Sequence, residues 1–360
     1  MSDKAQAVIE VKNLDITFKM PTGNVHALRG VDFTLRENEV LALVGESGCG
    51  KSVTAKAIMG ILPENGMINS GEVVFHDGGE SIDLLQKKIS WRRKNINGSK
   101  ISMIFQDPMT SLNPTMSIGA QLIVAIRNHE EITKKEAYAR SLELLYEVGI
   151  TDPERTMEQY PHQLSGGMRQ RIVIAIALSC NPKVIICDEP TTALDVTIQN
   201  RILDLIQKIQ RTRGISVIFI THNLGVVAKI ADYVGVMYAG KIIEVGSIFD
   251  VFYDPRHPYT WGLLSAIPDV SDEKGELYSI PGTPPNLAKE IVGDAFAPRN
   301  PFALDIDFKA EPPLFKASGT HYVASWLMDE RAPKVEMPDN LKERIASMKK
   351  EGLLYVEGRE

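Results

Sequence analysis

The feature that most constrains the fold of this chain is a phosphate-binding loop at residues 45–52, GESGCGKS, which matches G-x-x-x-x-G-K-[ST] at every fixed position. The apolar segment at residues 40–44 precedes it and predicts a buried parallel strand. Residues 53–59 follow it and predict a packed helix that opens at Lys51. In such a loop, glycines let backbone N–H groups point at an anion, and the helix start adds a partial positive charge. The sequence therefore predicts an α/β protein built around a phosphate site.

The residue types in the loop give its positions different expected roles. Lys51 is expected to reach the β- and γ-phosphates of a nucleotide, and the Ser52 hydroxyl is expected to hold Mg²⁺. Upstream, Phe18 could stack on an adenine ring or could equally belong to the core. The expected nucleotide-binding set at the loop is Gly45, Glu46, Ser47, Gly48, Cys49, Gly50, Lys51, Ser52 and Val53.

Two further apolar strands are predicted to end in polar groups. Residues 184–187 lead to Asp188, which can hold Mg²⁺ through water, and to Glu189, which can accept a proton from an attacking water. Residues 216–221 lead to His222. A lone histidine usually has a structural role, but at a strand's carboxyl end in an open α/β sheet it faces the ligand crevice.

Gln106 and residues 164–167 are weaker signals when each is taken alone. Gln106 directly follows a predicted strand at residues 100–105, where it can bind Mg²⁺ or orient a water while the next loop moves. Residues 164–167, LSGG, open a long apolar helix and offer bare N–H groups and a hydroxyl to a second phosphate. An ordinary helix N-cap at Ser165 is the alternative interpretation.

Composition excludes several classes of protein. Apolar residues make up 44% of the chain and charged residues 24%, as in soluble globular proteins, and the length suggests about two domains. The net charge of −6 gives no global positive field for nucleic acid or anionic lipid. Three cysteines without a CxxC pair fit a reducing compartment. Without a signal peptide or an apolar run of about 18 residues, we expect a cytosolic protein that meets membranes only through a partner.

Along the chain, residues 7–45 predict short strands of an antiparallel sheet with one wet face. Residues 63–100 are interpreted as a surface excursion, and the basic run around Trp91 as a solvated helix face rather than a contact for an anionic surface. Residues 117–160 predict helices. Residues 251–337 are Pro-rich and irregular, and residues 338–352 predict a short helix with Leu341, Ile345 and Met348 on one side.

Taken together, these motifs resemble, in order, those of the ATP-binding cassette (ABC) ATPases, over about residues 8–250. The family-specific motif is Ser165-Gly166-Gly167, because the phosphate loop and the strand that ends at Asp188 would by themselves allow any P-loop NTPase. The resemblance implies a P-loop NTPase core (a RecA-like mixed sheet), an antiparallel β subdomain and a helical signature subdomain at about residues 110–178. It also implies a nucleotide-binding domain at residues 1–250 and an irregular C-terminal domain at residues 251–360.

The resemblance also implies roles for individual residues. ATP would be bound between two subunits, so that Ser165, Gly166 and Gly167 complete the partner's site. Glu189 would be the general base, His222 would contact the γ-phosphate, and Gln106 would sense it and couple to the membrane partner. Asp195 would cross the dimer interface. The implied catalytic set is Glu189, His222, Gln106 and Lys51, and the implied Mg²⁺ set is Ser52, Gln106 and Asp188.

Four longer stretches resemble the oligopeptide/dipeptide importer branch of this family: residues 105–114, 190–197, 257–260 and 279–285. The branch implies a peripheral subunit at the cytoplasmic face of the membrane that hydrolyses ATP to import peptides. The implied partners are a related second ATPase, two integral membrane permease subunits and an extracellular or periplasmic peptide-binding protein, and no nucleic acid. The alternatives are the ATPase of a nickel or other solute importer, a soluble cassette ATPase acting on nucleic acid, or a regulatory subunit that does not hydrolyse ATP.

Members of this branch often hold an iron–sulfur cluster with cysteines of the C-terminal segment. The matching positions here hold Asp294, Asn300, Asp307 and Ser325. Since these residues cannot replace a set of thiolates, we predict that no cluster is bound. A loop held by packing alone is preferred to the alternative of an aspartate-rich site for a divalent metal.

Overall fold

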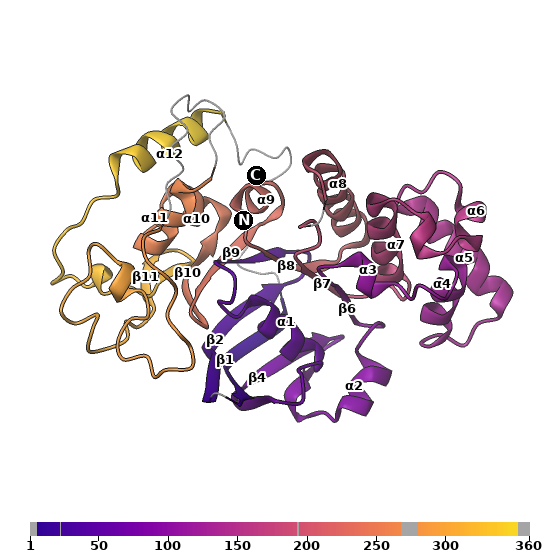
Figure 1. Ribbon diagram of the computed structural model, residues 1–360, viewed down its shortest axis with the longest axis horizontal. Helices are drawn as coiled ribbons and strands as arrows, with labels where there is room; N and C mark the ends of the chain where they lie inside the picture. Colours follow the sequence, from indigo (N-terminus) through magenta and orange to yellow (C-terminus); the bar gives the residue numbers. More distant parts are fainter. Residues whose placement is uncertain (1–5, 22, 193, 268–279, 352–360) are drawn as a thin grey trace.

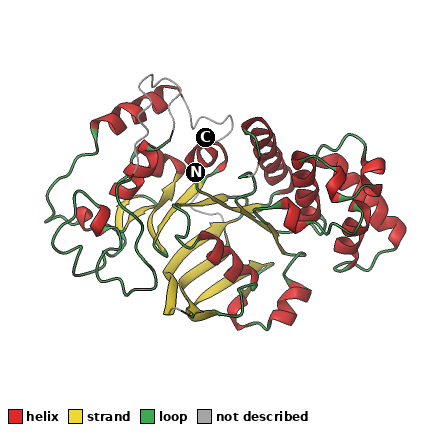
Figure 2. Cartoon of the chain, viewed as in Figure 1, coloured by secondary structure: helices red, strands yellow, loops and turns green. Residues whose placement is uncertain are grey.

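The computed structural model describes residues 6–21, 23–192, 194–267 and 280–351, and within them the strands form two sheets. Ser279 and residue 352, the ends of two of the stretches discussed above, lie outside the described residues. The antiparallel sheet and the main sheet lie beside each other near the centre of the molecule, and a group of helices extends to one side (Figure 1). Figure 2 shows that this group contains no strand.

The main sheet is mixed, as predicted, and its eight strands run in the order β11-β12-β10-β9-β3-β8-β7-β6. Neighbours from β9 to β6 pair in parallel, whereas β10, β11 and β12 pair antiparallel. The parallel strands are β3 (Val40–Val44), β6 (Ile101–Ile104), β7 (Val184–Asp188), β8 (Ser216–Thr221) and β9 (Tyr233–Tyr238). Every residue of β3, β7 and β8 is buried, which explains why the interior positions of these strands are all apolar.

The antiparallel sheet has four strands in the order β2-β1-β4-β5. Residues 7–45 were expected to form short strands, but β1 and β2 are a hairpin of two 14-residue strands with several register shifts. The sheet packs on helix α1 through a shared core that includes Leu28 and Phe75. Its members are β1 (Ala7–Met20), β2 (Gly23–Arg36), β4 (Gly66–Asp77) and β5 (Glu80–Asp83).

The prediction of a surface excursion at residues 63–100 is wrong, because β4 and β5 lie there and Val73 and Phe75 are fully buried. The first half of β4 faces solvent and contains glycine and asparagine, so its sequence resembles a loop. A Cβ at Gly71 would lie 2.6 Å from the Asn13 carbonyl oxygen, so glycine is needed at this point, where the backbones of the paired strands β4 and β1 approach closely.

The basic run lies on and beside helix α2 (Ile89–Asn95), and Trp91 is partly exposed there. Arg92 departs from the predicted solvated face because it is only 3% exposed. Its guanidinium donates hydrogen bonds to the carbonyl oxygens of Ala57 and Ile58 at the end of helix α1 (Lys51–Met59). One member of this run therefore caps a helix inside the protein.

Helices occur across residues 117–160, as predicted, and the helices between residues 108 and 178 pack on the β6–β7 side of the main sheet through one large core. Ala137 and Leu145 of α5 are buried in this core. These elements are α3 (Pro108–Ser111), α4 (Ile118–Arg127), α5 (Lys134–Glu147), α6 (Pro153–Glu158), η2 (Pro161–Gln163) and α7 (Gly166–Leu178).

The described part of the C-terminal segment contains more strands and helices than its Pro-rich sequence suggests. Strands β11 (Phe315–Ser318) and β12 (His321–Val323) extend the main sheet beyond β10 (Lys241–Ser247), so the segment shares a sheet with the preceding residues. Helix α10 spans residue 250, where the domain boundary was expected. The remaining elements are α8 (Val196–Arg213), α9 (Leu224–Ile230), α10 (Ile248–Tyr253), α11 (Pro258–Ser265), α12 (Asp339–Glu351) and the short helices η1 (Leu84–Gln86), η3 (Ala297–Arg299) and η4 (Trp326–Met328).

The predicted apolar side of the last helix is confirmed. Leu341, Ile345 and Met348 of α12 are buried in a core that includes side chains of α10 and α11. This core lies on the β9–β10 side of the main sheet, where the C-terminal segment gathers in Figure 1.

Phe75 tests the placement of residues 63–100 in the core. We expect Phe75→Ala to lower the free energy of unfolding by about 3–5 kcal/mol, because it removes a fully buried ring. Met67→Ala on the exposed half of the same strand is the matched control and should change it by less than about 0.5 kcal/mol. Chemical denaturation measures both variants, and equal losses would contradict the assignment.

Candidate functional site

The predicted phosphate loop joins β3 to α1, and α1 begins at Lys51 as expected. Gly45 has φ of +148°, and a Cβ there would lie 2.1 Å from the Met237 carbonyl oxygen, so only glycine fits. Gly50 is left-handed and precedes the first helical residue. Ser47 and Gly48 lie exposed at the tip of the loop, while Cys49 is buried and Val53 packs on the core of the antiparallel sheet. The loop therefore presents its tip to solvent from a fixed base.

Lys51 is 4% exposed, and its ammonium group faces the interior of the loop. Its Nζ donates hydrogen bonds to the carbonyl oxygens of Gly45 (2.7 Å) and Glu46 (2.9 Å), and Cys49 Sγ lies 3.6 Å away. The loop thus holds a buried positive charge close to its backbone, where a phosphate would be attracted.

The structure brings together two of the three residues predicted to hold Mg²⁺. Ser52 Oγ donates a 2.8 Å hydrogen bond to Asp188 Oδ1 at the end of β7. Burial raises the pKa of Asp188, the bond from Ser52 lowers it, and the net pKa is above its ordinary value. A hydroxyl and a carboxylate fit the oxygen preference of Mg²⁺. Gln106 is not part of this pair and contacts Glu189 instead.

Glu189 is the centre of a second set of contacts at the same edge of the sheet. Its carboxylate accepts hydrogen bonds from Gln106 Nε2 (3.2 Å) and Thr192 Oγ1 (2.9 Å), and His222 Nδ1 lies 3.1 Å away. Burial acts to raise the pKa of Glu189, but the hydrogen bonds from His222 and Thr192 outweigh it, so the pKa is below its ordinary value. Glu189 is therefore a carboxylate at neutral pH, as a proton acceptor must be.

Thr192 was missed by the sequence analysis, although it lies only three residues after Glu189. Glu189 has φ of +48°, and this turn brings the Thr192 hydroxyl back to the carboxylate. A threonine after two carboxylates carries no signal by itself, because the turn that makes the contact is visible only in the structure.

Ser165, Gly166 and Gly167 open α7, and Ser165 is the N-cap of that helix, with Oγ accepting from Met168 N at 3.3 Å. Ser165 and Gly166 are exposed. Asp195 is likewise exposed and caps α8 by accepting from Ile198 N at 3.0 Å. A Cβ at Gly167 would lie 3.0 Å from Ile198, so the two helix starts are adjacent. Within the described residues, no hydrogen bond joins this surface to the phosphate loop.

Phe18 is half-buried, and both interpretations of it remain open. Its ring edge would lie 3.0 Å from a Cβ at Gly66, and it packs against the core of the antiparallel sheet. Stacking on an adenine ring stays a prediction.

The four residues at the positions of the cluster-binding cysteines are all buried, and the side chain of each accepts a hydrogen bond from a backbone N–H group. Asp294 accepts from Phe296 N, Asn300 from Phe302 N, Asp307 from Leu304 N, and Ser325 from Leu327 N. Burial raises the pKa of Asp294 to about 6. Among the described residues, no group of three or more His, Cys, Asp or Glu side chains could hold a metal ion. The donor set therefore does not fit an iron–sulfur cluster.

Comparisons with known proteins agree with this geometry. The chain matches the family model described as "ABC transporter" over residues 28–192 and the one described as "Oligopeptide/dipeptide transporter, C-terminal region" over residues 243–306. It is 53% identical to the oligopeptide transport ATP-binding protein OppD of Bacillus subtilis, covering 95% of this chain and 94% of the relative. It is 52% identical to the dipeptide transport ATP-binding protein DppD of Lactococcus lactis, covering 93% and 95%.

Solved structures show the same fold. A dimeric ATP-binding cassette, MJ0796, in a post-hydrolysis state bound to ADP and Pi has a TM-score of 0.58 and 27% identity, covering 67% of this chain and 98% of that one. The cbiO1 protein of Clostridium perfringens, part of an ABC transporter complex, has a TM-score of 0.58 and 31% identity, covering 69% and 91%. None of the helices in the described ranges is long and apolar enough to cross a membrane.

Proposed function

The chain belongs to the ABC transporter family, in its oligopeptide/dipeptide branch, and we propose that it is the subunit whose ATP hydrolysis powers peptide import. The observation that carries this proposal is the position of the Glu189 carboxylate. Glu189 directly follows Asp188, which accepts a hydrogen bond from Ser52 of the phosphate loop, and its pKa is below the ordinary value. The relatives support peptide import over the nickel-import and nucleic-acid alternatives, since both named relatives are peptide transport proteins.

The chemistry proposed for the site is mainly electrostatic. Lys51 and the backbone N–H groups of the loop stabilise the charge that develops on the transferring phosphoryl group. Ser52 and Asp188 would hold Mg²⁺, which would supply positive charge to neutralise the phosphates. Glu189 accepts the proton of the attacking water, and its hydrogen bond from Thr192 keeps the carboxylate oriented.

His222 and Gln106 have a second proposed role besides holding Glu189. The His222 side chain is 53% exposed, so it remains accessible to the γ-phosphate while its Nδ1 faces Glu189. Gln106 is exposed as well, at the start of the loop that leads to α3. Movement of this loop would change the hydrogen bond to Glu189, which links the loop to the catalytic carboxylate.

The surface formed by the exposed Ser165, Gly166 and Asp195 and the half-buried Gly167 is proposed to complete the nucleotide site of a second ATPase subunit. Its support is that the same chain already has a phosphate site at another place, and no described contact joins the two. The proposed assembly contains this chain, a related ATPase, two integral membrane permease subunits and a peptide-binding protein. The ATPases would lie at the cytoplasmic face of the membrane.

Glu189→Gln tests the proposed base. We expect it to lower ATP turnover by about 10²–10⁴-fold, because the amide cannot accept the proton, and to leave ATP binding unchanged. ATPase assays and ATP titrations of the assembled transporter measure both effects. In vesicles, the same variant should abolish ATP-dependent peptide uptake.

Thr192→Val serves as a graded control for that experiment, since it removes one hydrogen bond to the base and keeps the carboxylate. Its loss of turnover should be much smaller than that of Glu189→Gln. A normal rate of ATP hydrolysis by Glu189→Gln would show that Glu189 is not the general base. A complex that hydrolyses ATP but imports no peptide would contradict the proposed substrate class.

Iron analysis tests the proposal that no iron–sulfur cluster is bound. Protein purified without oxygen should contain negligible iron and inorganic sulfide. The four side chains have no thiolate to bind iron, and each already accepts a hydrogen bond from a backbone N–H group. Iron in stoichiometric amounts with sulfide would contradict this expectation.

A further inference from the structure

Arg299, in the C-terminal segment, makes a direct contact with the phosphate loop. Its guanidinium forms a bidentate ion pair with Glu46, the second residue of the loop, with Nη1 2.7 Å from Oε2 and Nη2 3.0 Å from Oε1. The two residues are 253 positions apart. The Arg299 side chain is 4% exposed, so this pair is shielded from solvent on the arginine side.

The remaining contacts of Arg299 fix its position. Its Nε donates to Pro281 O (2.9 Å), and its Nη1 donates to the hydroxyl of Tyr238 at 3.2 Å. The guanidinium also lies 5.7 Å from the centre of the Tyr238 ring. Because the Arg299 guanidinium is held by several contacts, its position is fixed independently of Glu46, and it can therefore fix the position of the Glu46 carboxylate.

Tyr259 makes a second contact with the same loop residue. Its hydroxyl oxygen accepts a 2.9 Å hydrogen bond from the backbone N–H of Glu46. The Tyr259 ring is fully buried and packs against Tyr238 and Phe296, with ring centroids 4.7 Å and 5.4 Å away. The C-terminal segment therefore holds both the side chain and the backbone of Glu46.

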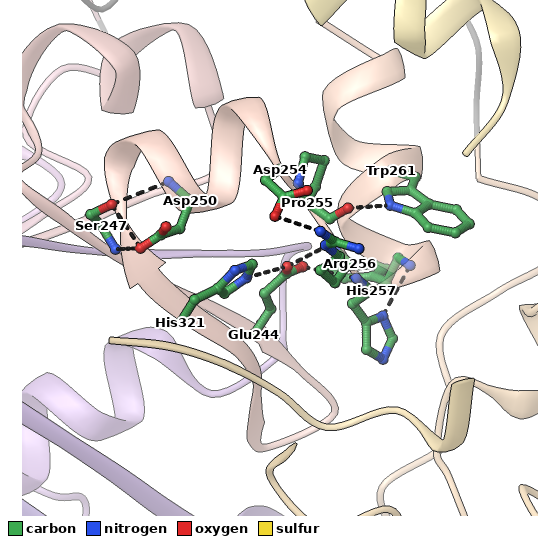
Figure 3. A network of polar contacts seen from close by, with 10 residues as sticks. Glu244, Ser247, Asp250, Asp254, Pro255, Arg256, His257, Trp261 and His321 are labelled. Atoms are coloured by element: carbon green, nitrogen blue, oxygen red, sulfur yellow. Dashed lines mark hydrogen bonds and ion pairs between the residues drawn. The ribbon is translucent and has the colours of Figure 1, made fainter. Parts of the chain in front are cut away.

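Glu244 of β10 anchors the helix that carries Tyr259, as Figure 3 shows. Its buried carboxylate accepts hydrogen bonds from the backbone N–H groups of Arg256 (2.7 Å) and His257 (3.1 Å), directly before α11. His321 Nε2 of β12 lies 2.8 Å from the same carboxylate. The start of α11 is thus tied to two strands of the main sheet, which gives Tyr259 a rigid support.

We propose that Arg299 and Tyr259 are positioning residues of the ATP site, through which the C-terminal segment sets the conformation and charge of the phosphate loop. This inference rests on the proposed function, namely that the loop binds ATP. An unpaired carboxylate at Glu46 would repel a triphosphate in the adjacent anion site, and Arg299 neutralises it. The bidentate geometry also prevents the start of the loop from moving away from its anion-binding position.

A double-mutant cycle on ATP affinity of the full chain tests the proposal. Arg299→Ala should weaken ATP binding at least tenfold, about 1.4 kcal/mol, because it releases the loop and leaves Glu46 unpaired. Glu46→Ala should have a smaller effect, because no carboxylate remains to repel the triphosphate. The double variant should resemble Glu46→Ala, so the loss caused by Arg299→Ala should largely disappear in that background.

The kinetic pattern separates positioning from catalysis. In the assembled transporter, Arg299→Ala should raise the KM for ATP and change kcat at saturating ATP by less than about threefold, since Glu189 and its partners are untouched. Tyr259→Phe should raise KM by a smaller factor, because it removes one hydrogen bond and keeps the ring. If Arg299→Ala does not fold, Arg299→Gln, which keeps a long polar side chain and removes the charge, takes its place in the cycle with the same expected result.

Glu311→Ala is the matched control. Glu311 is also in the C-terminal segment and pairs with Arg29 of β2 and Lys241 of β10, without touching the phosphate loop. Glu311→Ala should leave ATP affinity unchanged, and its only expected effect is a lower thermal stability. If Arg299→Ala lowers thermal stability but leaves ATP affinity at the wild-type value, or if the two losses in the cycle are additive, the proposal is wrong.

ATP binding by Lys51→Ala distinguishes failure of this inference from failure of the proposed function. A wild-type chain that binds ATP and a Lys51→Ala variant that does not would uphold the ATP site whatever the result for Arg299. A wild-type chain that binds no ATP would overturn the proposed function and the inference together.

Discussion

The parallel pairing of β3, β8 and β7 is the constraint on which the candidate site depends. All three strands are buried along their whole length, and their polar residues are confined to the first or last position of a strand. Parallel strands end at the same edge, and the residues that follow them therefore meet there. The Ser52–Asp188 hydrogen bond and the contact between Glu189 and His222 both follow from this arrangement, although their residues come from distant parts of the chain.

The same sheet explains why the C-terminal segment can reach the phosphate loop. Strand β9 lies next to β3 and carries Tyr238, and β10 beyond it carries Glu244. Since β11 and β12 extend that side, the segment is built onto the sheet that also supports the loop. By linkage, any effect of the segment on ATP affinity must be matched by an equal effect of ATP on the segment.

The parts of the site that could be predicted from the sequence are those whose signals are local. The phosphate loop and the strand that ends at Asp188 were placed correctly, because apolar runs and a glycine pattern lie within a few residues of each other. The contact between Arg299 and Glu46 had no such signal, since a single arginine 253 positions away is one of many. Strands β11 and β12 have only four and three residues, too few to show a periodic pattern in a Pro-rich segment. Strand β4 was missed because its exposed half has a loop-like sequence.

We propose that ATP is bound from two sides, by the phosphate loop of one subunit and by the Ser165–Gly167 surface of another. A structure of the assembled complex with ATP, using the Glu189→Gln variant to slow hydrolysis, tests it most directly. We expect Ser165 of one ATPase subunit to lie within hydrogen-bonding distance of the γ-phosphate held by its neighbour. Ser165 far from every nucleotide, together with turnover by the wild-type chain as a lone monomer, would contradict it.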